Sequence, residues 1–113
     1  MEMVWSNKID EIFKAGISLH NLGIRNWAFS KEQSFLVLEQ LLEAQIAVLG
    51  GDVATKSNNV IELNYDNWFC NQLLGEAKSD FVIRSINKAK IYIENYPTAM
   101  PNQIYFLFVP SLE

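Results

Sequence analysis

Apolar and polar positions in the N-terminal part of the chain alternate with the period of an α-helix in two places. From Ser6 to about His20, apolar residues recur at helical spacing, which predicts a first helix. Ser30 and Gln33 then match a capping box, in which each side chain bonds the other residue's backbone at the start of a helix. The second helix should follow at once and end near Gln45.

The middle of the chain changes to the two-residue period of a β-strand. The apolar run 46–49 leads into Gly50-Gly51, which predicts a strand with a bend or bulge at the glycines. Turn-forming residues occupy 56–59, and the alternating segment 60–66 predicts a half-buried strand in a hairpin with residues 52–56. The apolar face of this strand would hold Ile61, Leu63 and Tyr65, and the outward face Glu62, Asn64 and Asp66.

The last part of the chain predicts a loop, a helix and a strand. Residues 67–78 have no clear period and contain Gly75, so we expect a loop there. Ser79 can cap a third helix, whose apolar residues recur every three or four positions until Pro97. The nearly unbroken apolar run 103–109 predicts a central strand that is covered on both faces.

Together these elements predict an α+β fold, with three helices packed on a small, mainly antiparallel sheet in the order ααββαβ. A chain of 113 residues has the usual size of one domain, and half of its residues are apolar, which is enough for a core of its own. We therefore expect residues 1–113 to form a single domain.

The acidic excess of the chain lies in its middle. Residues 32–80 carry eight acidic and two basic residues, whereas the segments on either side each have a small basic excess. Such a region repels phosphates, so it disfavours nucleic acids and anionic membranes as partners and favours a cationic partner. A solvated surface that only aids solubility is the alternative interpretation.

Three features favour the cytoplasm as the location of the protein. No apolar stretch approaches the roughly 20 residues that span a bilayer. The first ten residues do not resemble a secretory leader. Cys70 is the single cysteine and cannot form an internal disulfide, which fits a reducing compartment.

The sequence predicts no catalytic residue, no metal site and no cofactor. It contains no phosphate loop, dinucleotide fingerprint, calcium loop or cysteine–histidine metal spacing, and nothing pairs its single histidine, His20, with Cys70. A small acid–base hydrolase that uses Asp52 and Asp66, with or without His20, remains an alternative. Glu62 and Asp66 would lie about 13 Å apart on an extended strand, which is too far for the usual glycosidase pair.

The segment from Tyr65 to Phe69 places three aromatic rings next to a carboxylate and an amide. Exposed aromatic residues with acidic neighbours are typical of protein-binding hot spots, although core packing explains at least two of the rings. For Trp68 the core and the interface remain equal alternatives. The candidate binding residues are Asp52, Glu62, Asn64, Tyr65, Asp66 and Trp68.

Several segments of the chain resemble the immunity protein 40 family. The two most specific are Leu49-Gly50-Gly51-Asp52-Val53 and Tyr65-Asp66-Asn67-Trp68, and the resemblance covers about residues 9–109. Further matching segments are Ala15-Gly16, Leu22-Gly23-Ile24, Asn26-Trp27-Ala28, Ile46-Ala47-Val48, Ala89, Tyr92-Ile93 and Tyr96-Pro97. Ala54 stands where the family often carries an aromatic residue.

The resemblance implies an immunity protein of a bacterial polymorphic toxin or contact-dependent inhibition system. Such a protein binds the C-terminal domain of its cognate toxin in the cytoplasm and blocks it. These toxins are often nucleases with basic substrate-binding surfaces, which an acidic partner would suit, and the role requires no catalytic group. A structural subunit that pairs through a sheet edge is the third possibility, and the oligomeric state remains open.

Overall fold

The computed structural model describes residues 7–20, 23, 26–97 and 103–111. Its elements are α1 (Asn7–Phe13), β1 (Ile17–Ser18), β2 (Trp27–Ala28), α2 (Lys31–Glu43), β3 (Val48–Ser57), β4 (Val60–Phe69), α3 (Lys78–Asn95) and β5 (Ile104–Pro110). The α+β class is confirmed, and the predicted order ααββαβ holds once the two short strands β1 and β2 are added.

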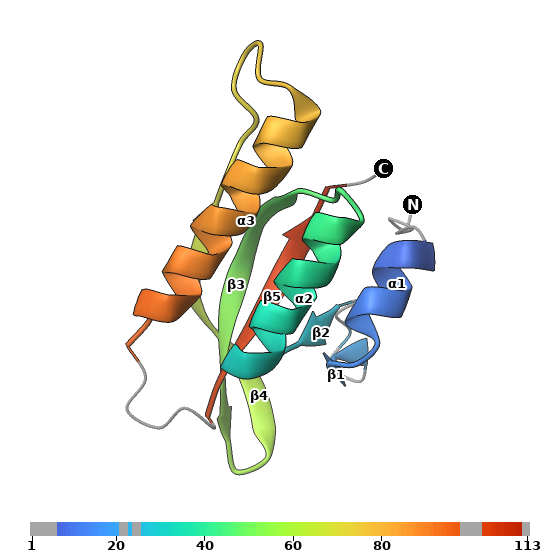
Figure 1. Ribbon diagram of the computed structural model, residues 1–113. Coiled ribbons are helices and arrows are strands. Elements are labelled where there is room, and N and C mark those ends of the chain that lie inside the picture. The colour runs from blue at the N-terminus through green and yellow to red at the C-terminus, as the bar shows by residue number, and fades with distance from the viewer. Residues whose placement is uncertain (1–6, 21–22, 24–25, 98–102, 112–113) are drawn as a thin grey trace.

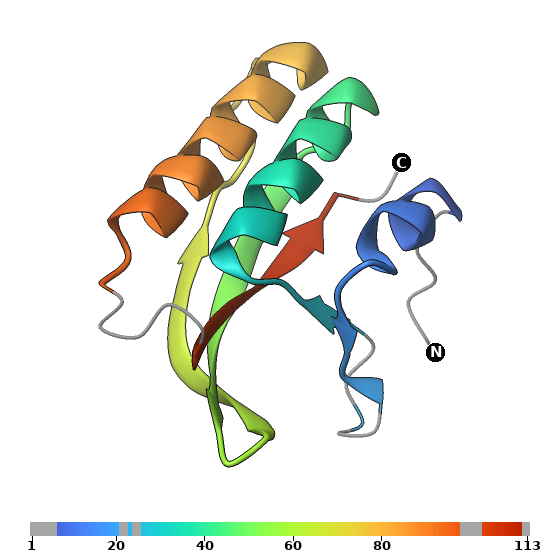
Figure 2. The same cartoon turned by 60° about the horizontal axis from the view of Figure 1, so that its bottom comes forward.

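The strands form two antiparallel sheets, one in the order β4-β3-β5 and a small one of β1 and β2. Helices α2 and α3 lie side by side across one face of the larger sheet, and α1 lies beside α2 (Figure 1). Figure 2 shows the helix layer and the sheet as separate layers, with the β3–β4 turn extending beyond the helices. The core between the layers contains Phe13, Phe29, Phe106 and Phe108, all fully buried.

The start of α2 is the element that the sequence predicted best. The Gln33 backbone N–H donates to Ser30 Oγ at 3.2 Å, and the Ser30 backbone N–H donates to Gln33 Oε1 at 3.2 Å. The predicted capping box is therefore confirmed, because two backbone donors that the helix leaves unpaired find side-chain acceptors. The helix ends at Glu43, two residues before the expected Gln45.

The first helix is shorter than expected. It ends at Phe13 instead of continuing to His20, and residues 17–18 pair as a strand with residues 27–28. Gly16 lies so close to Phe29 that an added Cβ would be 2.6 Å from its ring. The close packing of this backbone against a buried ring decides against a longer helix. Ser6, the expected cap, lies outside the described residues.

The β3–β4 hairpin confirms the predicted turn and lengthens the predicted strand. Asn58 and Asn59 have φ of 52° and 64°, which are the two left-handed positions of a type I′ turn. The bend expected at the glycines is present as a register shift between Val48 and Gly50. Strand β4 continues to Phe69, however, through residues 67–69 that were expected in a loop.

Two expectations for the C-terminal part were wrong. Ala77, not Ser79, is the N-cap of α3, and no side chain bonds the first turn of the helix. The central strand of the sheet is β3, not β5. Strand β5 is nevertheless buried on both faces, because Leu107 packs against Leu19 and Ala28 from the β1–β2 unit on the side opposite the helices.

Among the described residues, no helix is both long enough and apolar enough to cross a bilayer.

Candidate protein-binding surface on the β3–β4 hairpin

A bulge interrupts β4 halfway along its length. Ala54 pairs with Leu63 and Asp52 pairs with Asn67, so three residues of β4, 64–66, lie opposite the single residue Val53 of β3. Bulges redirect side chains that a regular strand would place by alternation. The three redirected residues, Asn64, Tyr65 and Asp66, are all predicted binding residues.

Tyr65 lies at the centre of the bulge with its ring in solvent. Its φ is 71°, in the left-handed region that aromatic residues rarely adopt, and its exposed fraction is 86%. The alternation of the sequence placed Tyr65 on the buried face, and the bulge makes that prediction wrong. Unusual backbone conformations of this kind persist only where surrounding contacts hold them, and they concentrate at functional sites.

Four hydrogen bonds hold the bulge. The Asp66 backbone N–H donates to Asn64 Oδ1 at 2.9 Å, and Asn67 Nδ2 donates to the Tyr65 carbonyl at 3.0 Å. The Tyr96 hydroxyl accepts from Asn64 Nδ2 at 2.9 Å and donates to Asp66 Oδ2 at 2.6 Å. Tyr96 follows the last residue of α3, so the helix fixes the shape of the strand.

Aromatic stacking connects Tyr96 to the core. The Tyr92 ring stacks on that of Tyr96 with the ring centroids 5.8 Å apart, and it makes a tilted contact with that of Trp68 at 4.7 Å. Burial raises the pKa of the Tyr96 phenol, and the hydrogen bond to Asp66 raises it further. Burial and the negative charge of Asp66 likewise raise the pKa of Tyr92. Both phenols therefore remain neutral, and Tyr96 keeps the proton that it donates to Asp66.

Trp68 belongs to the core. Its exposed fraction is 7%, and its ring makes an edge contact with Phe108 at 6.0 Å. The ring covers Gly51, where an added Cβ would collide with the indole and with the Leu107 carbonyl. This burial resolves the two interpretations of Trp68 in favour of the core, and it removes the ring from the surface that a partner can contact.

The predicted acidic residues do not form one patch. Asp52 lies in the regular part of β3 next to Val53, which packs in the core under the helices, so alternation places Asp52 on the opposite face of the sheet. Asn64 and Asp66 lie on the helix side, where they contact Tyr96. Glu62 is exposed beside the turn and pairs with Thr55. The Asp52 side chain is therefore separated from the other candidate residues by the sheet.

The residues of the hydrolase alternative are separated in the same way, because Asp52 and Asp66 project from opposite faces of the sheet. His20 packs against the Trp27 ring at 5.5 Å, near the β1–β2 unit. Cys70 is buried at the end of β4, and its sulfur accepts from Arg84 Nη1 at 3.2 Å. Within the part of the chain that the structure describes, no three His, Cys, Asp or Glu residues are placed to hold a metal ion.

The model of the family described as immunity protein 40 matches residues 18–110, including the glycine segment of β3 and the whole bulge of β4. The chain belongs to the immunity protein 40 family. No curated protein and no solved structure matches it significantly.

Membership of the immunity protein 40 family confirms the resemblance seen in the sequence and gives the chain an immunity function in general terms. Two residues that shape this family member's surface were missed from the sequence. Tyr96 was noted only as part of the resemblance, although its spacing of four residues from Tyr92 on a helix is a signal for stacked rings. Arg84 gave no signal, because its partners come from a loop that precedes its helix.

Proposed function

We propose that this chain binds the C-terminal domain of a cognate toxin through the β3–β4 hairpin and thereby blocks the toxin. The exposed Tyr65 ring, held out by a bulge that α3 stabilises, is the observation that carries the proposal. Aromatic anchors of this kind contribute much of the binding energy of protein interfaces. An anchor whose backbone is already fixed loses less conformational freedom on binding, which favours affinity.

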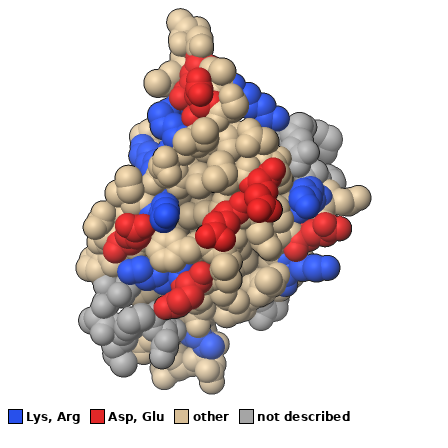
Figure 3. Space-filling view, viewed as in Figure 1, with Lys and Arg blue, Asp and Glu red and all other residues tan. Residues whose placement is uncertain are grey.

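The charge around this anchor supports a basic partner, and we propose that the toxin is a nuclease. Glu62 and Asp66 are exposed carboxylates on the same side of the hairpin as the Tyr96 contact. Helix α2 adds the exposed carboxylates of Glu32, Glu39 and Glu43, and Figure 3 shows acidic side chains along this helix. A nuclease binds phosphates with basic residues, so a negative surface attracts it and competes for the same site.

In this proposal the protein acts in the cytoplasm of the producing cell and needs neither a cofactor nor a catalytic group. Nucleic acid and membrane are not its partners, because phosphate-rich surfaces are repelled by the same carboxylates. Inhibition of a toxin at low abundance requires nanomolar affinity or better, about −12 kcal/mol. A rigid anchor supplies slow dissociation, and the charges supply fast association.

The decisive test of the anchor is Tyr65→Ala against the toxin domain encoded beside this chain's gene. That domain is purified by unfolding the co-expressed complex and refolding the released toxin. We expect the dissociation rate to rise about 30-fold, equivalent to about 2 kcal/mol. Leu36→Ala removes another exposed apolar side chain, from α2, and is the control. If Tyr65→Ala binds as tightly as this control, the hairpin is not the binding site.

The test of the charge uses Glu62→Lys, with Glu11→Lys as a control that changes the net charge equally but lies on α1. We expect Glu62→Lys to lower the association rate more than the control does at low salt, with the difference shrinking as salt is added. Equal effects of the two variants would show that only the total charge matters and that the hairpin does not face the partner.

A further inference from the structure

The segment that connects β4 to α3, residues 70–77, forms one end of the molecule and displays two leucines in water. It is the loop at the top of Figure 1. The exposed fractions of Leu73 and Leu74 are 60% and 107%, so both side chains point away from the protein. Single exposed apolar residues are common, but an adjacent pair at a loop tip forms a local apolar patch, which marks interaction sites.

Arg84 holds this loop in shape. Its Nε donates to Glu76 Oε2 at 2.8 Å and its Nη2 to Glu76 Oε1 at 2.7 Å, the paired geometry of a strong arginine–carboxylate contact. The same Nη2 donates to the Asn71 carbonyl at 2.6 Å, and the Leu73 backbone N–H donates to Glu76 Oε1 at 3.0 Å. These bonds fix the backbone on both sides of the leucine pair.

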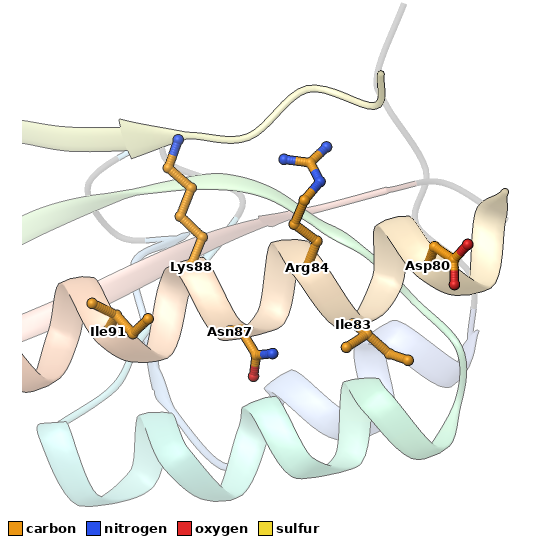
Figure 4. A pocket seen from close by; sticks show the side chains of 6 residues that line it. All are labelled: Asp80, Ile83, Arg84, Asn87, Lys88 and Ile91. Atoms are coloured by element: carbon orange, nitrogen blue, oxygen red, sulfur yellow. The ribbon is translucent and has the colours of Figure 1, made fainter. Parts of the chain in front are cut away.

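The loop continues the edge of the sheet that carries Tyr65. Phe69, with an exposed fraction of 65%, lies between Tyr65 and the leucines along the chain. Lys88 Nζ donates to the Phe69 carbonyl at 2.5 Å and lies 5.2 Å from the centre of its ring. Figure 4 shows Arg84 and Lys88 reaching from α3 towards β4 and the segment that follows it, whereas Ile83 and Ile91 do not point there.

The segment from Phe69 to Leu74 has no charged residue of its own. Of the two cations that reach it from α3, Arg84 pairs with Glu76, and the Lys88 ammonium bonds the Phe69 carbonyl. Arg84, together with the Leu73 N–H, lowers the pKa of Glu76 to about 2, so the carboxylate stays ionised and paired at neutral pH. A partner surface that covers Leu73 and Leu74 would therefore be apolar and uncharged where it meets them.

We propose that the Leu73–Leu74 loop is a second anchor, which enters an uncharged apolar recess on the same toxin domain that Tyr65 contacts. This inference rests on the proposed function and adds a second contact to it. Leu74 follows Tyr65 by nine positions along the chain, which spans at most about 30 Å at roughly 3.3 Å per residue. One standard interface buries about 800 Å² per partner and is roughly 30 Å across. A single toxin domain can therefore cover both anchors.

The test is the double variant Leu73→Ser/Leu74→Ser, measured against the refolded toxin domain. Both side chains are exposed, so we expect normal folding, and we expect the dissociation rate to rise at least about tenfold. Leu36→Ser/Ile83→Ser is the matched control, because it removes two side chains with exposed fractions of 61% and 51% from the helix layer. We expect the control to bind as the wild type does.

A second variant tests the Arg84–Glu76 contact, which is the clamp of this loop, without removing the leucines. Arg84→Gln should speed hydrogen exchange at the Leu73 amide and raise the dissociation rate by a smaller factor than the double variant does. Accelerated exchange with unchanged binding would contradict the role of the clamp.

Failure of the proposed function and failure of the second anchor give different results. If the wild-type chain does not bind the toxin domain, the proposed function fails and this inference fails with it. If the wild type binds and the leucine double variant binds equally well, only the second anchor is wrong. Light scattering of the chain alone tests whether a second copy of the chain, instead of the toxin, covers the loop. A wild-type dimer that Leu73→Ser/Leu74→Ser converts to a monomer would show that a second copy covers the loop, which would also overturn the inference.

Discussion

The hydroxyl of Tyr96 donates a 2.6 Å hydrogen bond to the carboxylate of Asp66, 30 residues earlier in the chain. The bond joins the end of α3 to the bulge of β4, and the Tyr96 ring is stacked on Tyr92 in turn. The exposed Tyr65, next to Asp66, thus takes its position from the helix layer. A surface aromatic residue and the core are linked through one phenol.

Removing that phenol should loosen the binding surface and leave the fold intact. Tyr96→Phe keeps the ring but loses the bonds to Asp66 and Asn64. We expect the dissociation rate of the toxin complex to rise about three- to tenfold, because Tyr65 must then be ordered on binding. Tyr92→Phe, one turn earlier on α3, is the control, and it should bind as the wild type does. Equal dissociation rates for the two variants would show that the Tyr96 hydroxyl does not contribute to toxin binding.

Truncating Trp68 and truncating Tyr65 should change the free energy of unfolding by very different amounts, although the two residues are only three positions apart. Trp68→Ala removes a buried ring and should lower the free energy of unfolding by about 3–5 kcal/mol. Tyr65→Ala removes an exposed ring and should change it by less than about 0.5 kcal/mol. Urea unfolding followed by circular dichroism measures both. A small loss for Trp68→Ala would place the indole at the surface after all.

Gly51 should not tolerate a side chain. An added Cβ would collide with the Trp68 ring and the Leu107 carbonyl, so Gly51→Ala must displace a core ring or separate two strands. We expect a loss of about 1–3 kcal/mol in the free energy of unfolding. Gly75→Ala is the comparison: its Cβ would meet open space, and only its left-handed φ of 80° adds strain, about 1 kcal/mol. Equal losses would mean that Trp68 moves aside without cost.

The clamp of the leucine loop should resist acid. The pKa of Glu76 is lowered from 4.5 to about 2, first by the hydrogen bond from Arg84 and then by the Leu73 N–H. Because the pKa is lowered, the stability that ionised Glu76 contributes is complete above the ordinary pKa of 4.5. This stability is lost as the pH falls through about 2. The side-chain carboxyl carbon of Glu76, followed by NMR, should therefore titrate near pH 2. In Arg84→Gln its midpoint should move upward, and an unchanged midpoint would contradict the pairing.

The parts of the fold that could be predicted from the sequence depend on neighbours along the chain. Ser30 and Gln33 cap α2 because each reaches the other's backbone within one turn. Asn58 and Asn59 form the hairpin turn because both tolerate a left-handed backbone. Such local chemistry is complete within a few residues, and the family motifs around Gly51 and Trp68 were visible in the same way.

The candidate binding surface was only partly predictable. The sequence indicated Tyr65 and Asp66 as binding candidates, but alternation assigned Tyr65 to the wrong face because it cannot detect a bulge. Trp68 stayed ambiguous until its ring was seen to cover Gly51. The contact of Gly16 with Phe29, which ends the first helix early, likewise joins residues from different elements.

The sequence by itself therefore determined the class of the fold, the hairpin, the cap of α2 and the family, because each of these is written in local pattern or in motif. Only the tertiary structure decided which side chains reach solvent. Tyr65 is turned outward by the Tyr96 hydroxyl, and Leu73 and Leu74 are held outward by Arg84. In both cases a side chain of α3, or of the residue that caps it, bonds β4 or the loop that follows. These bonds join residues 8 to 30 positions apart, so they form only once α3 has packed beside β4, and no periodicity in the sequence records them.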